Sequence, residues 1–409
     1  MKNYNLVAYL LSPAAIRDRC RQILALAQKG KLAYFQYQAR RLNPTVDYVI
    51  TVIKENYPDL HVPYHSRWRH FDAGGIHRMS WIEQDLSEVD PLERGRILFD
   101  LVIVSVLLDA GAGMNWRYKE NRTQQLFTRS EGLAVAAFSL FLEGRFSLDS
   151  HKPLRADGEA LIRLSPEQLA EGFQVECNNP LLGLQGRTTL MNQLGKAVLN
   201  HPEYFGESTP RLGCLFDYLV QHAEDNQLSA VFIFDTIMKA FGSIWPGRIT
   251  LENINLGDCW PHPLLQTEQE GSELIPFHKL SQWLSYSLVE PLEAFGLSIE
   301  GMDQLTGLAE YRNGGLLLDC KLIELKDPNE AGQTHQPGST LIVEWRALTV
   351  ALLDLIAHKV RGNLQMDEKH FPLVKILQGG TWTAGRKIAH ELRRDGKPPI
   401  TLDSDGTVF

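Results

Sequence analysis

An acid, a phenol and a guanidinium stand side by side in the segment LTGLAEYRNGGLLLD, as Glu310, Tyr311 and Arg312. Apolar residues precede and follow them, so folding should bring these polar groups into surroundings that exclude water. In such a site a carboxylate can accept a proton or stabilise a developing positive charge, and a guanidinium can orient it. The structural alternative is a buried ion-pair network with Glu344 and Arg346 of STLIVEWRAL, as Glu310–Arg346 or Arg312–Glu344 pairs.

A second candidate acid, Asp109, follows the apolar run ILFDLVIVSVLL, which predicts a buried core helix over 97–108. Gly111 and Gly113 supply the helix stop. A carboxylate at a helix C-terminus faces the negative end of the dipole, which costs a few tenths to about 1 kcal/mol. Asp109 therefore either caps loop amides or pairs with Arg117, or it binds a ligand in a glycine-lined pocket, and both interpretations stay open.

Aromatic and basic residues gather in HVPYHSRWRHFDAGG, residues 61–75. Its three histidines do not predict a metal site, because Pro63 breaks the segment and no glutamate lies nearby. Arg67 and Trp68, with Arg69, are better suited to contact an anion or an aromatic ring.

The segment LENINLGDCWPHPLL predicts a rigid polar turn that carries Asp258, Trp260 and His262. A structural loop is the simpler interpretation of this turn, and contact with a ligand is the alternative.

The bulk composition excludes several classes of function. The chain has 409 residues, a net charge of −8 and a pI of about 5.9, which argues against a nucleic-acid-binding surface. The longest apolar run is too short for a membrane span and contains Asp100. Five cysteines without a C-x-x-C spacing argue against a disulfide framework or a thiolate zinc site and favour the reducing cytoplasm. No P-loop, GxGxxG, HExxH or GxSxG motif occurs in its expected context, and no cofactor or metal is predicted.

Ser12 and Pro13 predict the N-cap and first residue of a helix, which favours a folded segment over an export signal for LVAYLL near the start.

Three- and four-residue spacing of apolar side chains predicts a mainly α protein. We expect one large helical domain over 1–409 with small β insertions, and a possible division into 1–205 and 206–409. The best strand signals are LIRL at 161–164 and GLLLDCKLIEL at 315–325. The expected helices are 16–26, 47–55, 91–108, 130–142, 165–170, 188–199, 212–223, 228–241, 278–294 and 339–360.

Three C-terminal motifs follow one another in order: HKLSQWLSYSLVEPLEAFG, MDQLTGLAEYRNGGLLLD and GSTLIVEWRALTVALLDLI. They resemble the queuosine salvage family, helical nucleosidases with a DNA-glycosylase-like fold that cleave the N-glycosidic bond of queuosine or its 5′-phosphate. That family carries a Lys-x-x-Gln helix, a Leu-Thr-x-x-x-Asp-Tyr-Arg segment and a helix with Glu-x-Arg-Ala. The match covers about 80 residues.

Motifs along the whole chain resemble a nearer family. HSRWRHFDAGG, SVLLDAGAGMNWRY, NLGDCWPHP, GGTWTAGRKIAHELR and SDGTVF are similar to the uracil-catabolism proteins of fungi and bacteria. These occur beside a cyclohydrolase-like protein in a pathway that opens the uracil ring after ribosylation. The resemblance implies a small-molecule substrate, a ribosyl or phosphoribosyl urea, with other uracil-catabolism enzymes as partners. From charge and the short apolar runs, neither nucleic acid nor a membrane is expected as a partner.

Two departures from the salvage family bear on the chemistry. Glu310 replaces an aspartate, and Ser287 stands where that family has an acid. If the chemistry is shared, either Glu310 must do more or another acid, such as Asp109 or Asp258, substitutes for the missing one.

The resemblance implies that Glu310 is the base or cation stabiliser in N-glycosidic cleavage, oriented by Arg312 and Arg346. Asp109 or Asp258 would bind the ribose hydroxyls, and Trp260 and Trp68 would stack on the leaving group. A non-catalytic ligand-binding or scaffold partner of the ring-opening enzyme is the alternative.

The last candidate is QGGTWTAGRKIAHELRRDG, residues 378–396. Free amides at a helix start, capped by Thr381 or Thr383, together with Arg386 and Lys387 would bind the 5′-phosphate of a substrate. An ordinary capped surface helix is the alternative.

Overall fold

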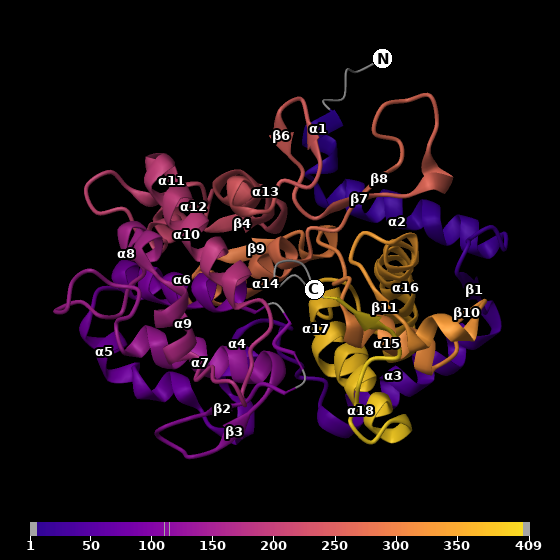
Figure 1. The fold of residues 1–409 in the computed structure, drawn as a ribbon, viewed down its shortest axis with the longest axis horizontal. Coiled ribbons are helices and arrows are strands. Elements are labelled where there is room, and N and C mark those ends of the chain that lie inside the picture. Colours follow the sequence, from indigo (N-terminus) through magenta and orange to yellow (C-terminus); the bar gives the residue numbers. More distant parts are fainter. Residues whose placement is uncertain (1–5, 110, 114, 404–409) are drawn as a thin grey trace. The chain divides into compact units, whose positions relative to one another are not determined.

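The computed structural model describes residues 6–109, 111–113 and 115–403 (Figure 1). Helices dominate this part of the chain, and each of its sheets has two strands, so the predicted mainly α class is confirmed. Packing divides the chain into two compact units, each assembled from distant segments. Unit 1 contains the described residues of 1–65, 247–282 and 301–403, and unit 2 contains those of 66–246 and 283–300. The predicted single domain, with its possible division near residue 205, stays a prediction.

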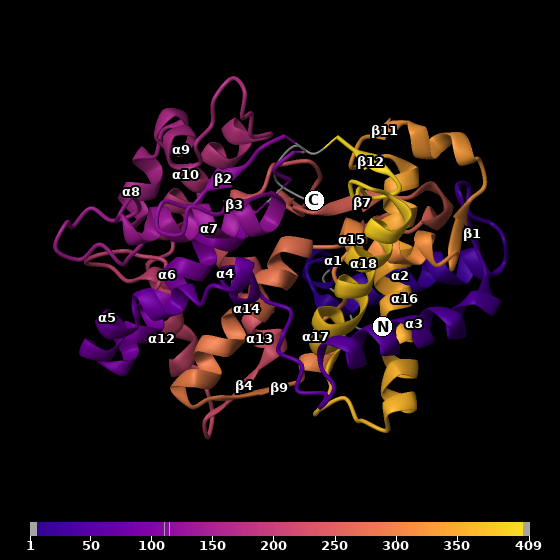
Figure 2. The same cartoon turned by 90° about the horizontal axis from the view of Figure 1, so that it is seen from below.

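Unit 1 is built around α16 (Thr340–Leu364), which Ser339 caps and which is buried on most sides in its first half. It packs against α2 (Pro13–Gln28), α3 (Leu42–Asn56) and α15 (Tyr311–Asp319), and α15 packs on α18 (Trp382–Leu392), as Figures 1 and 2 both show. The other elements of unit 1 are α1 (Leu6–Leu10), β1 (Phe35–Tyr37), η1 (Ala39–Arg41), β5 (Thr250–Leu251), β6 (Ile254–Asn255), β7 (Cys259–Pro261), η5 (Pro263–Leu265), β8 (Leu274–Pro276), η6 (Met302–Gln304), β10 (Ile323–Leu325), η7 (Pro328–Gly332), β11 (Thr334–His335), α17 (Leu373–Ile376), η8 (Leu377–Thr381) and β12 (Thr401–Leu402).

Unit 2 has α6 (Pro91–Leu107) at its centre, a helix buried from Ile97 to its end. It packs against α7 (Arg129–Leu142), α10 (Leu184–Asn200) and α12 (Cys214–Gln221). Its Asp100 is buried and bonds to Arg211 and to the amide of Gly213 (2.6 Å). The other elements of unit 2 are α4 (Trp68–Phe71), η2 (Ala73–Gly75), η3 (Arg78–Trp81), α5 (Glu83–Glu88), β2 (Tyr118–Lys119), β3 (Leu126–Phe127), α8 (Gly158–Arg163), α9 (Pro166–Gly172), α11 (Pro202–Phe205), β4 (Gln227–Ser229), α13 (Ala230–Phe241), η4 (Gly242–Ile244) and β9 (Ser298–Glu300).

One helix, α14 (Lys279–Phe295), begins in unit 1 and continues in unit 2. The strand pairs are β1–β10, β2–β3, β5–β6 and β7–β8, which are antiparallel, and β4–β9 and β11–β12, which are parallel.

All ten predicted helices are present, most with ends within a few residues of the prediction. The predicted cap at Ser12 is also present, since its side chain accepts from the amide of Ala15, and Ser165 forms a full capping box with Gln168. The segment LVAYLL near the start includes α1, whose Val7 and Leu10 lie in the core of unit 1.

Both strand predictions need correction. LIRL belongs mainly to α8, which packs so closely on α10 that a Cβ on Gly195 would lie 2.4 Å from the carbonyl oxygen of Gly158. In the second segment only Ile323–Leu325 forms a strand, and residues 315–319 complete α15. Short apolar runs fit either structure, and here packing against a neighbouring helix decides.

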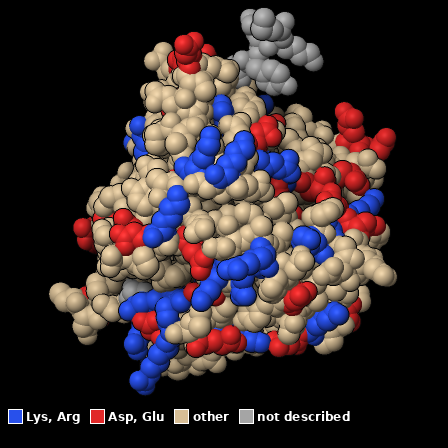
Figure 3. Space-filling model, turned by 90° about the vertical axis from the view of Figure 1, so that its right-hand side faces the viewer, with Lys and Arg blue, Asp and Glu red and all other residues tan. Residues whose placement is uncertain are grey.

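Lys and Arg side chains are interspersed with Asp and Glu on the face of the molecule shown in Figure 3. Among the described residues, no helix is both long and apolar enough to cross a membrane. The SDGTVF motif, residues 404–409, lies outside the described residues.

Candidate functional site

Glu310 is the N-cap of α15. Its two carboxylate oxygens accept from the backbone amides of Arg312 (2.7 Å) and Asn313 (2.5 Å). The side chain sits in a water-poor place, with 8% of the residue exposed. Burial raises the pKa of Glu310 above its ordinary 4.5, although the two amides and the charges of Lys279 and Arg312 oppose the shift. A carboxylate with a raised pKa is better matched to proton transfer near neutral pH than an exposed one.

Two buried amides flank the segment that leads to Glu310. Gln282, on the first turn of α14, accepts from the amide of Thr306 through Oε1 (3.3 Å). Asn313 donates through Nδ2 to the carbonyl oxygen of Leu308 (3.5 Å). Lys279, one turn before Gln282, is half-buried and contributes positive charge at Glu310. In unit 1 the charge of Lys279 therefore acts on Glu310, and two buried side-chain amides hold the segment that leads to it.

The resemblance implied that the Arg312 side chain orients Glu310, but the guanidinium makes other contacts. It donates to the carbonyl oxygen of Gly396 (3.0 Å) and lies over the ring of Tyr311 (5.1 Å from its centroid). Arg312 therefore acts on Glu310 through its backbone amide and through its charge. Tyr311 itself is half-buried.

Arg346 forms a buried bidentate pair with Asp258, both N–O distances being 2.7 Å. Neither of the predicted pairs, Glu310–Arg346 or Arg312–Glu344, is the one that forms. Burial alone would raise the pKa of Asp258, but the charge and hydrogen bonds of Arg346 outweigh it, and the pKa lies well below its usual range. Arg346 also stacks over Phe277, 4.1 Å from the ring centroid.

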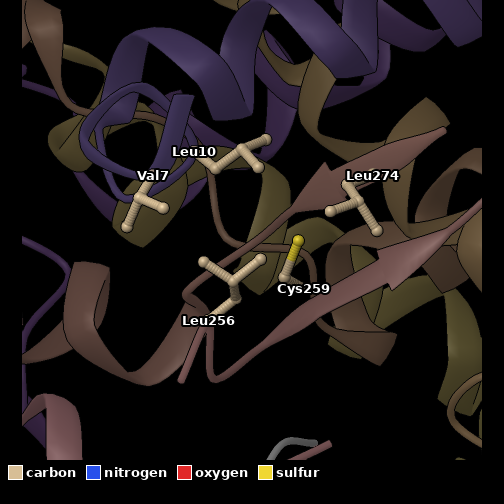
Figure 4. Packing of buried hydrophobic residues seen from close by; sticks show 5 residues of the cluster. All are labelled: Val7, Leu10, Leu256, Cys259 and Leu274. Atoms are coloured by element: carbon tan, nitrogen blue, oxygen red, sulfur yellow. The ribbon is translucent and has the colours of Figure 1, made fainter. Parts of the chain in front are cut away.

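The oxygens of Asp258 have further donors, Trp260 Nε1 (2.7 Å) and the amide of Lys279 (3.1 Å). Between Asp258 and Trp260, Cys259 points into an apolar cluster with Val7 and Leu10 (Figure 4). Alternation along the strand turns its neighbours away from that core. With both oxygens occupied, Asp258 is suited to holding the start of α14, and so Lys279 and Gln282, in place.

Glu344 and His262 also have structural contacts. The two oxygens of Glu344 accept from the amides of Ala33 (2.9 Å) and Tyr34 (3.0 Å). His262 Nε2 lies 3.4 Å from Glu344, and both side chains are fully buried. Trp260 is covered by Arg248, whose guanidinium lies 5.2 Å from the ring centroid. Glu344 and His262 thus form a buried polar contact between α16 and the residue that follows β7.

The predicted helix start near Arg386 is wrong. Residues 373–392 form a continuous helix, with a π turn at Leu377–Thr381, and Thr381 has helical backbone angles (φ −65°, ψ −41°). No free amides therefore face an anion there. Arg386 is exposed and lies over Trp382, and Lys387 bonds to Glu55 (2.5 Å).

The glycines of this segment permit close helix packing. A Cβ on Gly385 would lie 2.2 Å from the carbonyl oxygen of Arg312, and one on Gly379 would lie 2.8 Å from Val62. π turns occur often at functional sites, and this one packs against α15, the helix that Glu310 caps.

Asp109, in unit 2, pairs with Arg67 rather than with Arg117. Arg67 Nη1 donates to Asp109 (2.7 Å) and Nε to Ser105 Oγ (2.7 Å), while the hydroxyl of Ser130 also bonds to Asp109. Arg187 lies in the same region, and burial lowers its pKa to about 10. Both arginines are fully buried. Asp109 thus neutralises buried positive charge, which explains an acid at this helix end.

Ser287 fixes the position of Arg67. Its hydroxyl accepts from the Arg67 amide (3.0 Å), and its carbonyl oxygen accepts from Trp68 Nε1 (2.8 Å). That carbonyl is available because Pro291, four residues on in the helix, has no N–H to donate. Ser287 therefore supports the segment that presents Arg67 to Asp109.

Trp68 also lines a surface pocket of about 350 Å³ in unit 2. Glu290 lies in this pocket, bonded to Arg69 (2.7 Å) and Ser66 (2.5 Å), and burial raises its pKa. Among the described residues, no group of three or more His, Cys, Asp and Glu side chains is arranged to hold a metal.

Comparison with known proteins gives the family. Residues 9–409 match a family described as "Protein of unknown function (DUF1688)". The chain is 37% identical to "Uracil catabolism protein 4" of Lachancea kluyveri, over 99% of each chain. It is 36% identical to "Protein urg3" of Schizosaccharomyces pombe, over 98% of this chain and 99% of the relative. The chain belongs to the uracil-catabolism protein family.

In this member of the uracil-catabolism family, the predicted site residues fall into two groups. Asp109, Arg67 and Trp68 belong to unit 2, and the others belong to unit 1. The resemblance of the C-terminal half to the queuosine salvage family stays a prediction. The predicted site residues of unit 1 are Asp258, Trp260, His262, Glu310, Tyr311, Arg312, Glu344, Arg346 and Arg386.

Sequence reasoning did not select Lys279, Gln282 and Asn313 as site residues. The first two are the lysine and glutamine of the Lys-x-x-Gln helix, so the motif itself was a signal for them. Asn313 lies three residues after Glu310, which is the N3 position of a helix capped by that acid. Recognising the cap would have placed the Asn313 amide at the carboxylate.

Proposed function

We propose that this protein is an N-ribosyl hydrolase, a nucleosidase-like N-glycosidase of uracil catabolism. Its substrate would be a ribosylurea or phosphoribosylurea, and its products urea and ribose or ribose phosphate. The name of one relative, "Uracil catabolism protein 4", supports the pathway. The single observation that supports the chemistry is a nearly buried carboxylate with a raised pKa, Glu310, near the positive charges of Lys279 and Arg312.

The proposed reaction breaks the bond between C1′ of the ribose and a urea nitrogen. The sugar passes through an oxocarbenium-like state, whose positive charge the Glu310 carboxylate stabilises. The oxygen of a water molecule bonds to C1′, Glu310 accepts one of its protons, and the departing nitrogen takes up a proton. Because only the ionised carboxylate can act, the rate should fall as the pH drops through the raised pKa of Glu310.

The test is to supply the purified protein with ribosylurea, its 5′-phosphate, uridine and uridine monophosphate, and to measure free urea, base and sugar. We expect sugar and urea from one of the two ureides. Glu310→Gln should lower the rate by roughly 10²–10⁴ while ligand affinity stays within about tenfold, since this is the usual effect of losing a positioned acid–base group. Release of no sugar from any compound would refute the glycosidase.

Asp90 supplies a matched control. It caps α6 by accepting from the amides two and three residues on, Leu92 (2.9 Å) and Glu93 (3.1 Å), as Glu310 does at α15. Asp90→Ala removes this cap, so it should lower stability by roughly 1 kcal/mol and leave the rate unchanged. If both variants lose stability and neither loses rate, Glu310 is only a helix cap.

A non-catalytic ligand-binding or scaffold protein of the same pathway is the second candidate. It is favoured by Ser287, which stands in place of an acid of the salvage family, and by the two backbone amides that already bond Glu310. Such a protein would bind a ureide, with or without the ring-opening enzyme, and release no sugar.

A further inference from the structure

Two fully buried side chains that bond to the segment leading to Glu310 each have one polar atom without a hydrogen-bond partner. They are Gln282 Nε2, a donor, and Asn313 Oδ1, an acceptor. Most buried polar atoms in folded proteins are bonded, so an exception requires an explanation, such as a ligand or an ordered water. Here the two exceptions are a complementary donor and acceptor rather than two groups of one kind.

The other half of each amide is held in place. Gln282 Oε1 accepts from the amide of Thr306 (3.3 Å), and Asn313 Nδ2 donates to the carbonyl oxygen of Leu308 (3.5 Å). These contacts leave Nε2 of the glutamine and Oδ1 of the asparagine as the ends available to a ligand. Thr306 and Leu308 are two residues apart in the irregular segment before Glu310. The side-chain amides of Gln282 and Asn313 therefore bond to the same short segment.

Glu310 connects this arrangement to the reacting bond. The backbone N–H of Asn313 donates to the Glu310 carboxylate (2.5 Å), so the asparagine and the acid are held close to each other. A group bound between Gln282 and Asn313 would therefore lie close to the carboxylate. In N-glycosidic cleavage the part of the substrate next to C1′ on the nitrogen side is the leaving group.

We propose that Gln282 and Asn313 form an amide clamp for the ureide of the substrate. Gln282 Nε2 donates to the urea carbonyl oxygen, and Asn313 Oδ1 accepts from a urea N–H. A urea presents a carbonyl and an N–H side by side, which is the complement of one donor and one acceptor. The inference rests on the proposed function and assigns its leaving-group specificity to two residues.

The test measures binding by calorimetry with the full chain carrying Glu310→Gln, so that the ligand is not consumed. The ligands are ribosylurea and ribose. Gln282→Met and Asn313→Leu should each weaken ribosylurea binding about tenfold, the effect of one buried hydrogen bond, and change ribose binding less than about threefold. Equal weakening of both ligands, or no change in either, would overturn the clamp.

Two further variants keep the result interpretable. Gln282→Glu keeps an acceptor for the Thr306 amide but lacks the Nε2 donor, so it should weaken ribosylurea binding even if the methionine variant folds poorly. Gln378→Met removes a glutamine of unit 1 that bonds to His65 (2.8 Å), and it should leave both affinities unchanged.

Failure of the clamp and failure of the proposed function give different results. If the wild-type chain releases no sugar but binds ribosylurea in a way that depends on Gln282 and Asn313, the clamp stands and the hydrolase fails. If sugar is released and neither variant discriminates ribosylurea from ribose, the hydrolase stands and the clamp fails. No ribosylurea binding at all refutes the clamp.

Discussion

Breaking the Asp258–Arg346 pair by removing one partner should strongly destabilise unit 1. Both side chains are almost fully buried and joined by two 2.7 Å hydrogen bonds. Removing one partner of a buried pair leaves the other charge uncompensated, which costs about 3–5 kcal/mol. We expect a free-energy loss of that size for Asp258→Asn and for Arg346→Met, measured by urea unfolding at pH 7.

A double variant distinguishes the energy of the ion pair from that of the other hydrogen bonds to Asp258. Asp258→Leu with Arg346→Met removes both desolvated charges, which is often close to neutral, but it deprives Trp260 Nε1 and the Lys279 amide of an acceptor. At about 1–3 kcal/mol for each unsatisfied donor, the double variant should lose roughly 2–6 kcal/mol. In the cycle the aspartate single variant is Asp258→Leu, so the cost of the two unsatisfied donors is shared with the double variant and cancels. The cost of an uncompensated charge in each single variant, about 3–5 kcal/mol, then makes the coupling exceed ~2 kcal/mol.

The pH dependence has a definite sign. Because the pKa of Asp258 is lowered in the folded protein, its contribution is fully present above the ordinary value of 3.8 and is lost as the pH falls through the lower folded value. The stability gap between wild type and Asp258→Asn should therefore be full at pH 7 and shrink below about pH 4.

A coupling below about 1 kcal/mol would refute the positioning role, since an exposed pair behaves that way. Unchanged stability in Asp258→Asn, with a raised KM for a ribosyl substrate, would instead favour the ribose contact that the sequence predicted.

Three further predictions concern other contacts. Gly385→Ala should lower the free energy of unfolding by about 1–3 kcal/mol in urea, because its Cβ would meet the Arg312 carbonyl oxygen at 2.2 Å. Arg386→Ala should change KM equally for phosphorylated and unphosphorylated substrate, since no helix starts there; a tenfold effect confined to the phosphorylated one would restore the phosphate site. Arg67→Met should destabilise by about 3–5 kcal/mol, because it leaves the buried Asp109 without its cation, and a melting curve like that of wild type would contradict this.

The sequence alone determined which segments are helical. Apolar spacing, together with caps such as Ser12 and Ser165, is local, so it could be recognised without knowing any partner. The same information predicted that Glu310, Arg346 and Asp109 would be buried polar groups. It could not decide between helix and strand for LIRL or residues 315–319, where apolar runs are short.

Only the tertiary structure decided which charges meet. Asp258 and Arg346 are 88 residues apart, and so nothing in their local sequence distinguishes their pair from Glu310–Arg346. The structure likewise shows that glycines of the predicted phosphate loop allow close helix packing, since Gly385 lies against Arg312 and Gly379 against Val62. Ion pairs and close packing depend on residues brought together by folding, whereas helix periodicity depends on residues three and four apart in the chain.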